Sequence, residues 1–263
     1  MLFRSALDAP STNQIAYLRG LSASAVLSTA FANQQVCAPV NLDGYAVTDQ
    51  PLKLYAEGKQ AQVPFMLGNT LREGFVKMPL PSLRETIRQE YRSLAARVLD
   101  AYGLGGPQPP PYDPVYGDAS VQYGTDQAHR CRVILTGLQH AATGKPFYQF
   151  QFSRDIPGQM NGSTHTDEIP YVFGEPALTA LKYNAPDQRK LSAQMVSYWT
   201  NFARTGDPNG PDLPKWSAFD GKTMAYMSFA PAGPTAGEGL RREQCEPFLE
   251  REKQSPTSRA SER

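Results

Sequence analysis

NGSTHTDEIPYVFG, residues 161–174, is the stretch around which the sequence is organised. A strand-like run at 146–152 precedes it, and a polar loop containing glycine then presents His165. An imidazole titrates near neutral pH, so a histidine on a loop beside a sheet can act as a general acid and base. A single histidine without further context is more often structural. Both interpretations of His165 stay open on this stretch alone.

Upstream, residues 63–67 form a short continuous apolar run, VPFML. Such a run is typical of a strand that is buried on both faces. It continues into GNTLREG at 68–74, which carries Glu73. A carboxylate on the loop just beyond a buried strand occupies a common active-site position in α/β sheets. A surface glutamate in contact with water fits the same pattern, and that alternative also stays open.

The composition is that of an ordinary globular protein. The 263 residues are 40% hydrophobic and 19% charged, which suits one large α/β domain or two small ones. The net charge of +1 produces no strong electrostatic field of either sign, so it indicates neither nucleic acid nor a membrane surface as a binding partner. The sequence contains no run of about 18 apolar residues, so no membrane span is predicted. The first residues, MLFRSALDAPS, lack the apolar segment of a signal peptide.

Three cysteines are present: Cys37, Cys131 and Cys245. They have neither the close spacing of a zinc site nor a C-x-x-C redox pair. One interpretation is a disulfide with one free thiol, and the other is three reduced thiols. The sequence predicts no metal site and no cofactor.

The spacing of apolar residues indicates several helices. Residues 125–142 are predicted to form one helix, with His129 and His140 facing solvent. The clearest amphipathic helix is predicted at 188–204, where large apolar residues recur every three or four positions. A last helix is predicted at 241–251.

Residues 20–24, GLSAS, begin like the esterase nucleophile elbow G-x-S-x-G but lack its last glycine. A helical pattern runs through them, so Ser22 is interpreted as an ordinary helix residue. No repeat or linker divides residues 1–251, which are predicted to be one domain or part of one. The polar tail at 252–263 is expected to be disordered.

Four stretches, in this order, resemble the type-B carboxylesterase family, the cholinesterase-like α/β hydrolases. VPFMLGNTLREG at 63–74 is similar to the family's strand followed by G-x-N-x-x-E-G. GSTHTDEIPYVFG at 162–174 is similar to G-x-x-H-x-x-E-[IL]-x-Y-V-F-G. YWTNFARTGDPN at 198–209 and LPKWSAF at 213–219 resemble two further segments. The resemblance implies an α/β class: the C-terminal part of an α/β-hydrolase fold, with a mostly parallel sheet flanked by helices and without the N-terminal strands and nucleophile elbow.

The resemblance also implies roles for individual residues. By position, Glu73 matches the family's catalytic acid and His165 its catalytic base. In the family's mechanism a serine attacks an ester carbonyl while the histidine transfers its proton, and the acid orients the imidazole. Glu168 matches a further family position and is expected to support the histidine loop. The H-x-x-E spacing is not the H-E-x-x-H zinc signature, so the resemblance implies no metal.

Cys131 and Cys245 fall where some secreted members of the family place a disulfide. A bridge closing a loop of that length would stabilise the fold by roughly 4–5 kcal/mol in the chain-entropy model. Because the redox compartment decides whether such a bridge forms, the bridged and reduced forms are equally open. A secreted or periplasmic location is suspected for a full-length protein, although the residues themselves fix no compartment.

The family's nucleophile stands in G-E-S-A-G, and its oxyanion hole in a Gly-rich loop further upstream. The sequence contains no G-x-S-x-G and no H-G-G or G-G-G run. The chain alone is therefore expected to be inactive, and a small-molecule ester is its expected partner only when an N-terminal half completes the site. The remaining strands are expected to leave one sheet edge open. Two alternatives are a non-catalytic cholinesterase-like interaction protein and a gene fragment without a function of its own.

Overall fold

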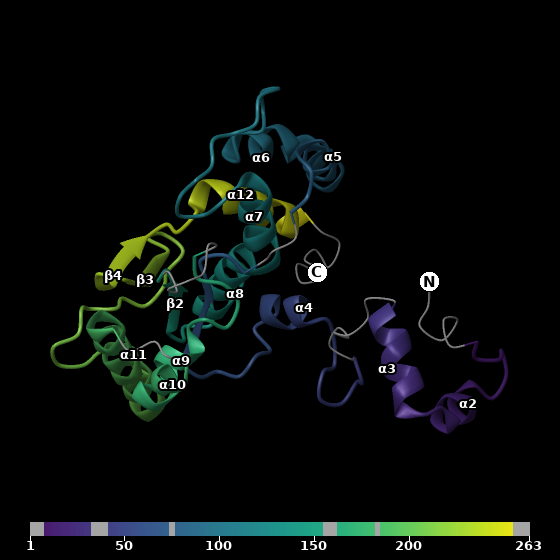
Figure 1. The fold of residues 1–263 in the computed structure, drawn as a ribbon, viewed down its shortest axis with the longest axis horizontal. Helices are drawn as coiled ribbons and strands as arrows, with labels where there is room; N and C mark the ends of the chain where they lie inside the picture. Colours follow the sequence, from purple (N-terminus) through teal and green to yellow (C-terminus); the bar gives the residue numbers. More distant parts are fainter. Residues whose placement is uncertain (1–7, 33–41, 74–76, 155–161, 182–184, 255–263) are drawn as a thin grey trace. The chain divides into compact units, whose positions relative to one another are not determined.

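The computed structural model divides into two compact units, residues 1–51 and 52–263, which are described separately. Cys37 lies outside the residues whose structure is described. Those residues are 8–32, 42–73, 77–154, 162–181 and 185–254 (Figure 1).

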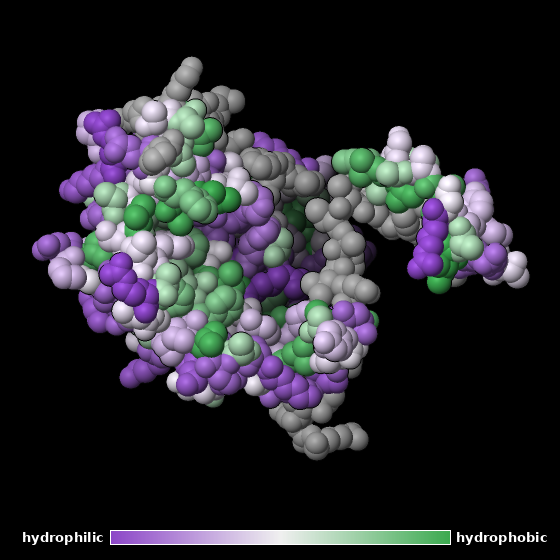
Figure 2. Space-filling view, turned by 90° about the horizontal axis from the view of Figure 1, so that it is seen from below, coloured by the Kyte–Doolittle hydropathy of each residue, from purple (hydrophilic) through white to green (hydrophobic). Residues whose placement is uncertain are grey.

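The N-terminal unit contains two short helices, α2 (Gln14–Gly20) and α3 (Ala23–Ala32). Neither helix has a buried residue. Several of its large apolar side chains, among them Ile15, Leu27 and Phe31, are exposed. Figure 2 shows hydrophobic surface in green on the part of the chain drawn at its right. Exposed apolar surface of this kind is unusual in a folded domain.

Ser22 lies just before α3 and not inside a helix as predicted. Its hydroxyl oxygen accepts a hydrogen bond of 3.1 Å from the amide of Ala25, which is how a serine caps a helix N-terminus.

Within the described ranges, no single helix is long and apolar enough to cross a membrane, and α2 and α3 reach that length and composition only as a pair bent by 105°.

The second unit is built on a four-stranded sheet in the order β1-β2-β3-β4 (Figure 1). The first three strands run parallel, and β4 returns antiparallel to β3. A mostly parallel sheet agrees with the predicted α/β class. Among the described residues, β1 pairs on one side only, with β2. The strands are β1 (Phe65–Thr70), β2 (Phe147–Phe152), β3 (Ala225–Ala230) and β4 (Gly233–Glu238).

Helices connect the parallel strands, because parallel neighbours need a crossover. One group joins β1 to β2, and a second group joins β2 to β3. The first group is α5 (Leu80–Tyr91), the 3₁₀ turn η1 (Arg92–Leu94), α6 (Ala95–Ala101), α7 (Ala119–Thr125), the π-helical turn η2 (Asp126–Arg130) and α8 (Cys131–Ala141). The second is α9 (Ile169–Phe173), α10 (Glu175–Ala180) and α11 (Pro186–Thr205), while α4 (Pro51–Ala56) precedes β1 and α12 (Arg242–Gln254) follows β4.

The central strand β2 separates two apolar clusters because its side chains alternate between the faces of the sheet. Phe147 packs with Ile134 of α8 and with Phe248 of α12. Tyr148 packs on the opposite face with Met195 of α11. Burial on both faces explains why β2 is rich in aromatic residues and has no solvent-exposed side, although it also buries Gln149 and Gln151.

The helix predicted at 125–142 is interrupted by η2, so it forms three successive pieces. His140 is also placed differently from the prediction, since it is buried and not solvent-facing. Its Nε2 lies 2.9 Å from the carbonyl oxygen of Val63, and its ring meets Phe65 edge-on. Helical spacing could not reveal the carbonyl at position 63 that makes burial of this imidazole favourable.

The amphipathic helix predicted at 188–204 is confirmed as α11. It ends at Gly206, whose φ of 78° suits glycine. The last helix, α12, runs to Gln254, three residues into the predicted disordered tail, and the rest of that tail lies outside the described residues. Arg251 extends the helix because its guanidinium stacks on the rings of Tyr91 and Phe248, at 4.5 and 5.0 Å.

Candidate active site

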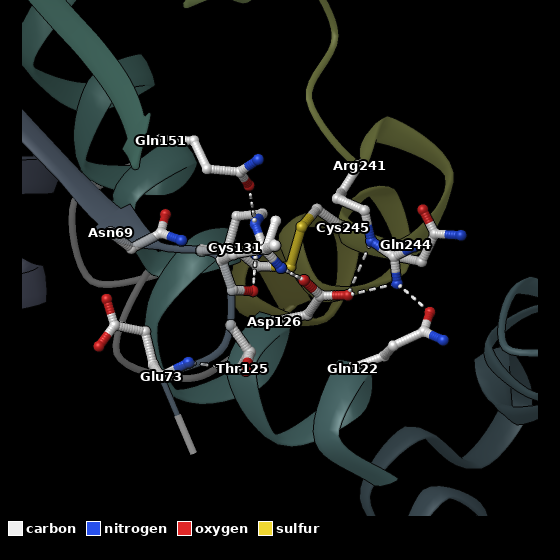
Figure 3. Close-up of polar contacts among 12 residues, drawn as sticks. Asn69, Glu73, Gln122, Thr125, Asp126, Cys131, Gln151, Arg241, Gln244 and Cys245 are labelled. Atoms are coloured by element: carbon white, nitrogen blue, oxygen red, sulfur yellow. Dashed lines mark hydrogen bonds and ion pairs between the residues drawn. A yellow bond between two sulfur atoms is a disulfide. The ribbon is translucent and has the colours of Figure 1, made fainter. Parts of the chain in front are cut away.

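The end of β1 turns sharply to bury the side chain of Glu73. The amide of Thr70 donates to Glu73 Oε1 at 2.6 Å, and the amide of Glu73 donates to Thr125 Oγ1 at 3.1 Å. Figure 3 shows Glu73 and Thr125 side by side at the end of the strand. The Glu73 side chain is 5% exposed, which excludes the sequence-based alternative of a solvated surface glutamate.

The loop after β2 runs beside the Glu73 loop, and Ser163 joins the two. A parallel bridge pairs Arg72 with Thr164. The hydroxyl of Ser163 donates to the carbonyl of Phe152 at 2.9 Å and accepts from the amide of Leu71 at 3.3 Å. Ser163 is fully buried, so its hydroxyl cannot meet a substrate in this arrangement.

These two loops bring Glu73 and His165 together although they are 92 residues apart in sequence. His165 Nδ1 lies 2.6 Å from Glu73 Oε2. A carboxylate accepts only, so a neutral imidazole in this contact carries its proton on Nδ1 and leaves the lone pair of Nε2 free. The His165 side chain is 64% exposed while Glu73 is almost fully buried. The pair therefore presents one basic nitrogen to solvent with a fixed negative charge behind it.

Asp167 holds the turn that presents His165. Its Oδ2 accepts from the amide of Thr164 at 2.6 Å and from the Thr164 hydroxyl at 2.9 Å. Between them, Thr166 has a φ of 76°, a left-handed conformation that strains a β-branched residue. Strain of this kind persists where the surrounding structure over-determines it, and it gathers at functional sites.

Replacing Thr166 by glycine is expected to raise the free energy of unfolding by about 1 kcal/mol, because glycine adopts the left-handed conformation without strain. Urea unfolding of the two chains measures the difference. Thr166→Ala keeps the β-carbon and should fall between them. A glycine variant less stable than the parent chain would show that position 166 carries no strain.

Glu168 lies beside this pair without a direct bond to it. Its Oε2 is buried and has no hydrogen-bond partner among the described residues. Burial raises the pKa of Glu168, and the nearby charge of Glu73 raises it further. The side-chain hydrogen bonds that hold the histidine loop come from Asp167 and Ser163, and no sequence motif pointed to Asp167.

A second histidine stands next to the pair. The rings of His129 and His165 have centroids 6.0 Å apart, and His129 is half-buried instead of facing solvent. Burial lowers the pKa of His129, an effect that Glu73 opposes and His165 adds to. Regular α-helical spacing could not reveal this placement, because His129 lies in the π-helical turn η2.

Behind Glu73 lies a buried ionic network (Figure 3). Arg130 is fully buried, pairs with Asp126, and donates to the carbonyl of Leu71 at 2.9 Å and to Gln151 Oε1 at 3.0 Å. Arg241 reaches the same aspartate at 2.9 Å. Because Leu71 is two residues before Glu73, this network fixes the start of the acid's loop. Helical spacing alone did not reveal it.

A disulfide joins Cys131 to Cys245. Cys131 follows Arg130 directly, and Cys245 lies one helical turn after Arg241, so the bridge ties α8 to α12 beside the ionic network (Figure 3).

Within the described ranges, no group of three or more histidine, cysteine, aspartate or glutamate side chains could hold a metal ion.

Comparison with known proteins points to one family. The model of the carboxylesterase family matches residues 7–248. Carboxylesterase 4A of Bos taurus is 31% identical over 215 residues, covering 71% of this chain and 37% of the relative. Bile salt-activated lipase of Bos taurus is 29% identical over 193 residues, covering 64% and 32%. The chain thus spans about a third of the length of these curated relatives.

Solved structures show the same fold. A PNB esterase matches with a TM-score of 0.71 at 20% identity, covering 94% of this chain and 52% of that one. A carboxylesterase of Geobacillus stearothermophilus matches with a TM-score of 0.72 at 21% identity, covering 93% and 53%. The α/β-hydrolase fold predicted from the motifs is confirmed.

Proposed function

The chain belongs to the carboxylesterase family, and from that premise we propose that it is the C-terminal half of a serine carboxylic-ester hydrolase. Residues 1–251 form part of the hydrolase domain and supply the catalytic acid, Glu73, and the catalytic base, His165. The observation that supports this is the 2.6 Å contact between His165 Nδ1 and the buried Glu73 carboxylate. This is the arrangement that a histidine needs to accept and return a proton.

In the proposed reaction, a serine on residues outside this sequence attacks the carbonyl carbon of a small-molecule ester. His165 Nε2 takes the serine proton and then delivers a proton to the leaving alcohol. Water next attacks the acyl-enzyme in the same way, and the acid is released. The Glu73 carboxylate keeps the imidazole in the productive tautomer and stabilises its charged form. Glu168 supports the loop through its carbonyl, which accepts from the amides of Tyr171 and Val172 at 3.0 and 3.1 Å.

The nucleophile and the oxyanion donors are assigned to an N-terminal half that carries the G-E-S-A-G motif. Neither Ser22, which caps a helix, nor the buried Ser163 serves as nucleophile in this proposal. The part of the relatives that this chain leaves unmatched is long enough to hold such a half. Without it, the chain is proposed to have no serine-esterase activity.

The test begins with the coding sequence upstream of residue 1. An in-frame segment with G-E-S-A-G is expected there, and the joined polypeptide should hydrolyse p-nitrophenyl butyrate and react with a fluorophosphonate at that serine. Glu73→Gln and His165→Ala should each lower kcat by about 10³-fold or more. Glu85→Gln makes the same chemical change at an exposed carboxylate of α5 and should leave kcat unchanged.

Two outcomes would overturn the proposal. In the first, the joined polypeptide folds and reacts with the fluorophosphonate, but its Glu73→Gln variant keeps the kcat of the parent. That result would remove Glu73 from the mechanism. An unrelated upstream gene, with no complementing half that binds the chain, would favour a non-catalytic interaction protein or a fragment without function of its own.

A further inference from the structure

We propose that this chain, without any serine nucleophile, hydrolyses activated aryl esters at His165 itself, with the acyl group carried on Nε2 and His129 acting as general base. The activity differs from the family's serine chemistry and does not depend on the proposed N-terminal half. It rests on the exposure of His165, the buried carboxylate behind it, and the second imidazole beside it.

His165 has the properties of a nucleophilic imidazole. Its side chain is 64% exposed, so an ester can approach Nε2 from solvent. The Nδ1 proton is donated to Glu73 Oε2 at 2.6 Å, and this contact stabilises the positive charge that the ring acquires when Nε2 bonds to carbon. Histidine is one of the side chains that form covalent acyl intermediates.

His129 supplies the second function that hydrolysis needs. Its ring centroid is 6.0 Å from that of His165, which places a second imidazole beside the ring that carries the acyl group. Burial lowers the pKa of His129. The charge of Glu73 raises that pKa, whereas His165, Arg130 and Arg132 lower it further. The lowered pKa favours the neutral ring, which can accept a proton from water.

Each step balances in atoms and charge. Nε2 of His165 attacks the acyl carbon of p-nitrophenyl acetate, a C–N bond forms, the C–O bond breaks, and p-nitrophenolate leaves with the electron pair. Water then attacks the acyl carbon while His129 takes one of its protons. The C–N bond breaks, its electron pair returns to Nε2, acetic acid departs and loses its own proton to solvent, and His129 passes the proton that it took to solvent.

The substrate class follows from what this site supplies. Nothing in the mechanism protonates the departing oxygen, so the leaving group must be stable as an anion, which nitrophenolates are and alkoxides are not. The site also assigns no oxyanion donors, which are commonly the largest single contribution to acyl transfer. The reaction is therefore slow and limited to activated aryl esters.

The experiment uses the purified chain with p-nitrophenyl acetate at pH 7 in a non-nucleophilic buffer, beside free imidazole at equal concentration. The chain should react at least about tenfold faster per imidazole, given the typical size of general-base effects. His165→Ala should lose this excess. The chain has three histidines, and His140 is buried. Any imidazole reactivity that the His165→Ala variant retains can therefore be assigned to His129.

His129→Gln separates the two steps. Deacylation should slow by about tenfold or more, so that acid quenching and mass spectrometry find acetyl on the peptide that contains His165. Glu73→Gln should slow acylation, while Glu85→Gln should not, and circular dichroism should show that each variant is folded.

Acetyl found only on lysines, or an unchanged rate in His165→Ala, would overturn the proposal. An unchanged acyl lifetime in His129→Gln would remove the second histidine from it. Acetyl on a serine would instead point to a nucleophile within this chain. Because the experiment needs no N-terminal half, its failure leaves the serine-hydrolase proposal intact, and failure of reconstitution leaves this one intact.

Discussion

Asp126→Ala is expected to lower the free energy of unfolding by about 3–5 kcal/mol, the usual cost of leaving a buried charge without its partner. Asp126 is fully buried and neutralises two cations, Arg130 and Arg241. Arg130 itself is fully buried, so neither water nor another anion among the described residues replaces the lost carboxylate. The substitution leaves two buried or nearly buried guanidinium groups without their anion, and it also removes the acceptor of the Tyr102 hydroxyl.

Urea unfolding followed by circular dichroism measures this loss. The matched control is Glu85→Ala, because Glu85 pairs with Arg88 where both side chains are more than half exposed. That pair should contribute less than about 1 kcal/mol. Asp126→Asn keeps the shape of the side chain and removes only the charge, so it isolates the electrostatic part. If the alanine variant lost no more than the control, the network would not be a stabilising feature of the fold.

Breaking the Cys131–Cys245 disulfide is expected to lower the free energy of unfolding by about 4–5 kcal/mol in the chain-entropy model, given the loop it closes. The sequence separation is 114 residues, so reduction restores a large number of conformations to the unfolded chain. The bridge also ties α12 to the start of α8, which is why its loss should loosen the contact of Arg241 with Asp126.

Unfolding of the oxidised chain is compared with that of the Cys131→Ala/Cys245→Ala double variant, with and without dithiothreitol. The reductant should destabilise the parent chain and leave the double variant unchanged. Thiol titration of the denatured chain should find one thiol before reduction and three after it, because one pair of the three cysteines is bridged. Three thiols before reduction would contradict the bridge.

The sequence predicted those features that repeat over short distances. The runs at 63–67 and 146–152 indicated strands that the structure contains: β1 begins two residues later and ends three residues later than predicted, and β2 begins one residue later. The spacing of Leu191 and Met195 predicted α11, because an amphipathic period is a local property of the chain. Motif order identified the family before any fold was known, since each motif is itself a contiguous stretch.

Orientation within a helix was harder to predict. His129 and His140 were both expected to face solvent, and neither does. The π-helical turn at Asp126–Arg130 changes the phase of the helix, and the partners of the two rings come from elsewhere in the chain. The sequence shows that a histidine is present and can be buried if its ring has a partner. It does not show which distant residue that partner is.

The sequence by itself identified the family, indicated the type and order of the elements that it singled out, and predicted which residues carry chemistry. Only the tertiary structure decided that His165 meets Glu73, that Ser163 joins their loops, and that Arg130 and Asp126 form a buried ionic network behind the acid. The physical reason is that periodicity and motifs act over a few residues, whereas His165 and Glu73, like Ser163 and Leu71, are 92 residues apart and meet only because β1 lies beside β2. Arg130 and Asp126 are close in sequence, but their burial behind Glu73 depends on residues from β1, β2 and the segment before α12.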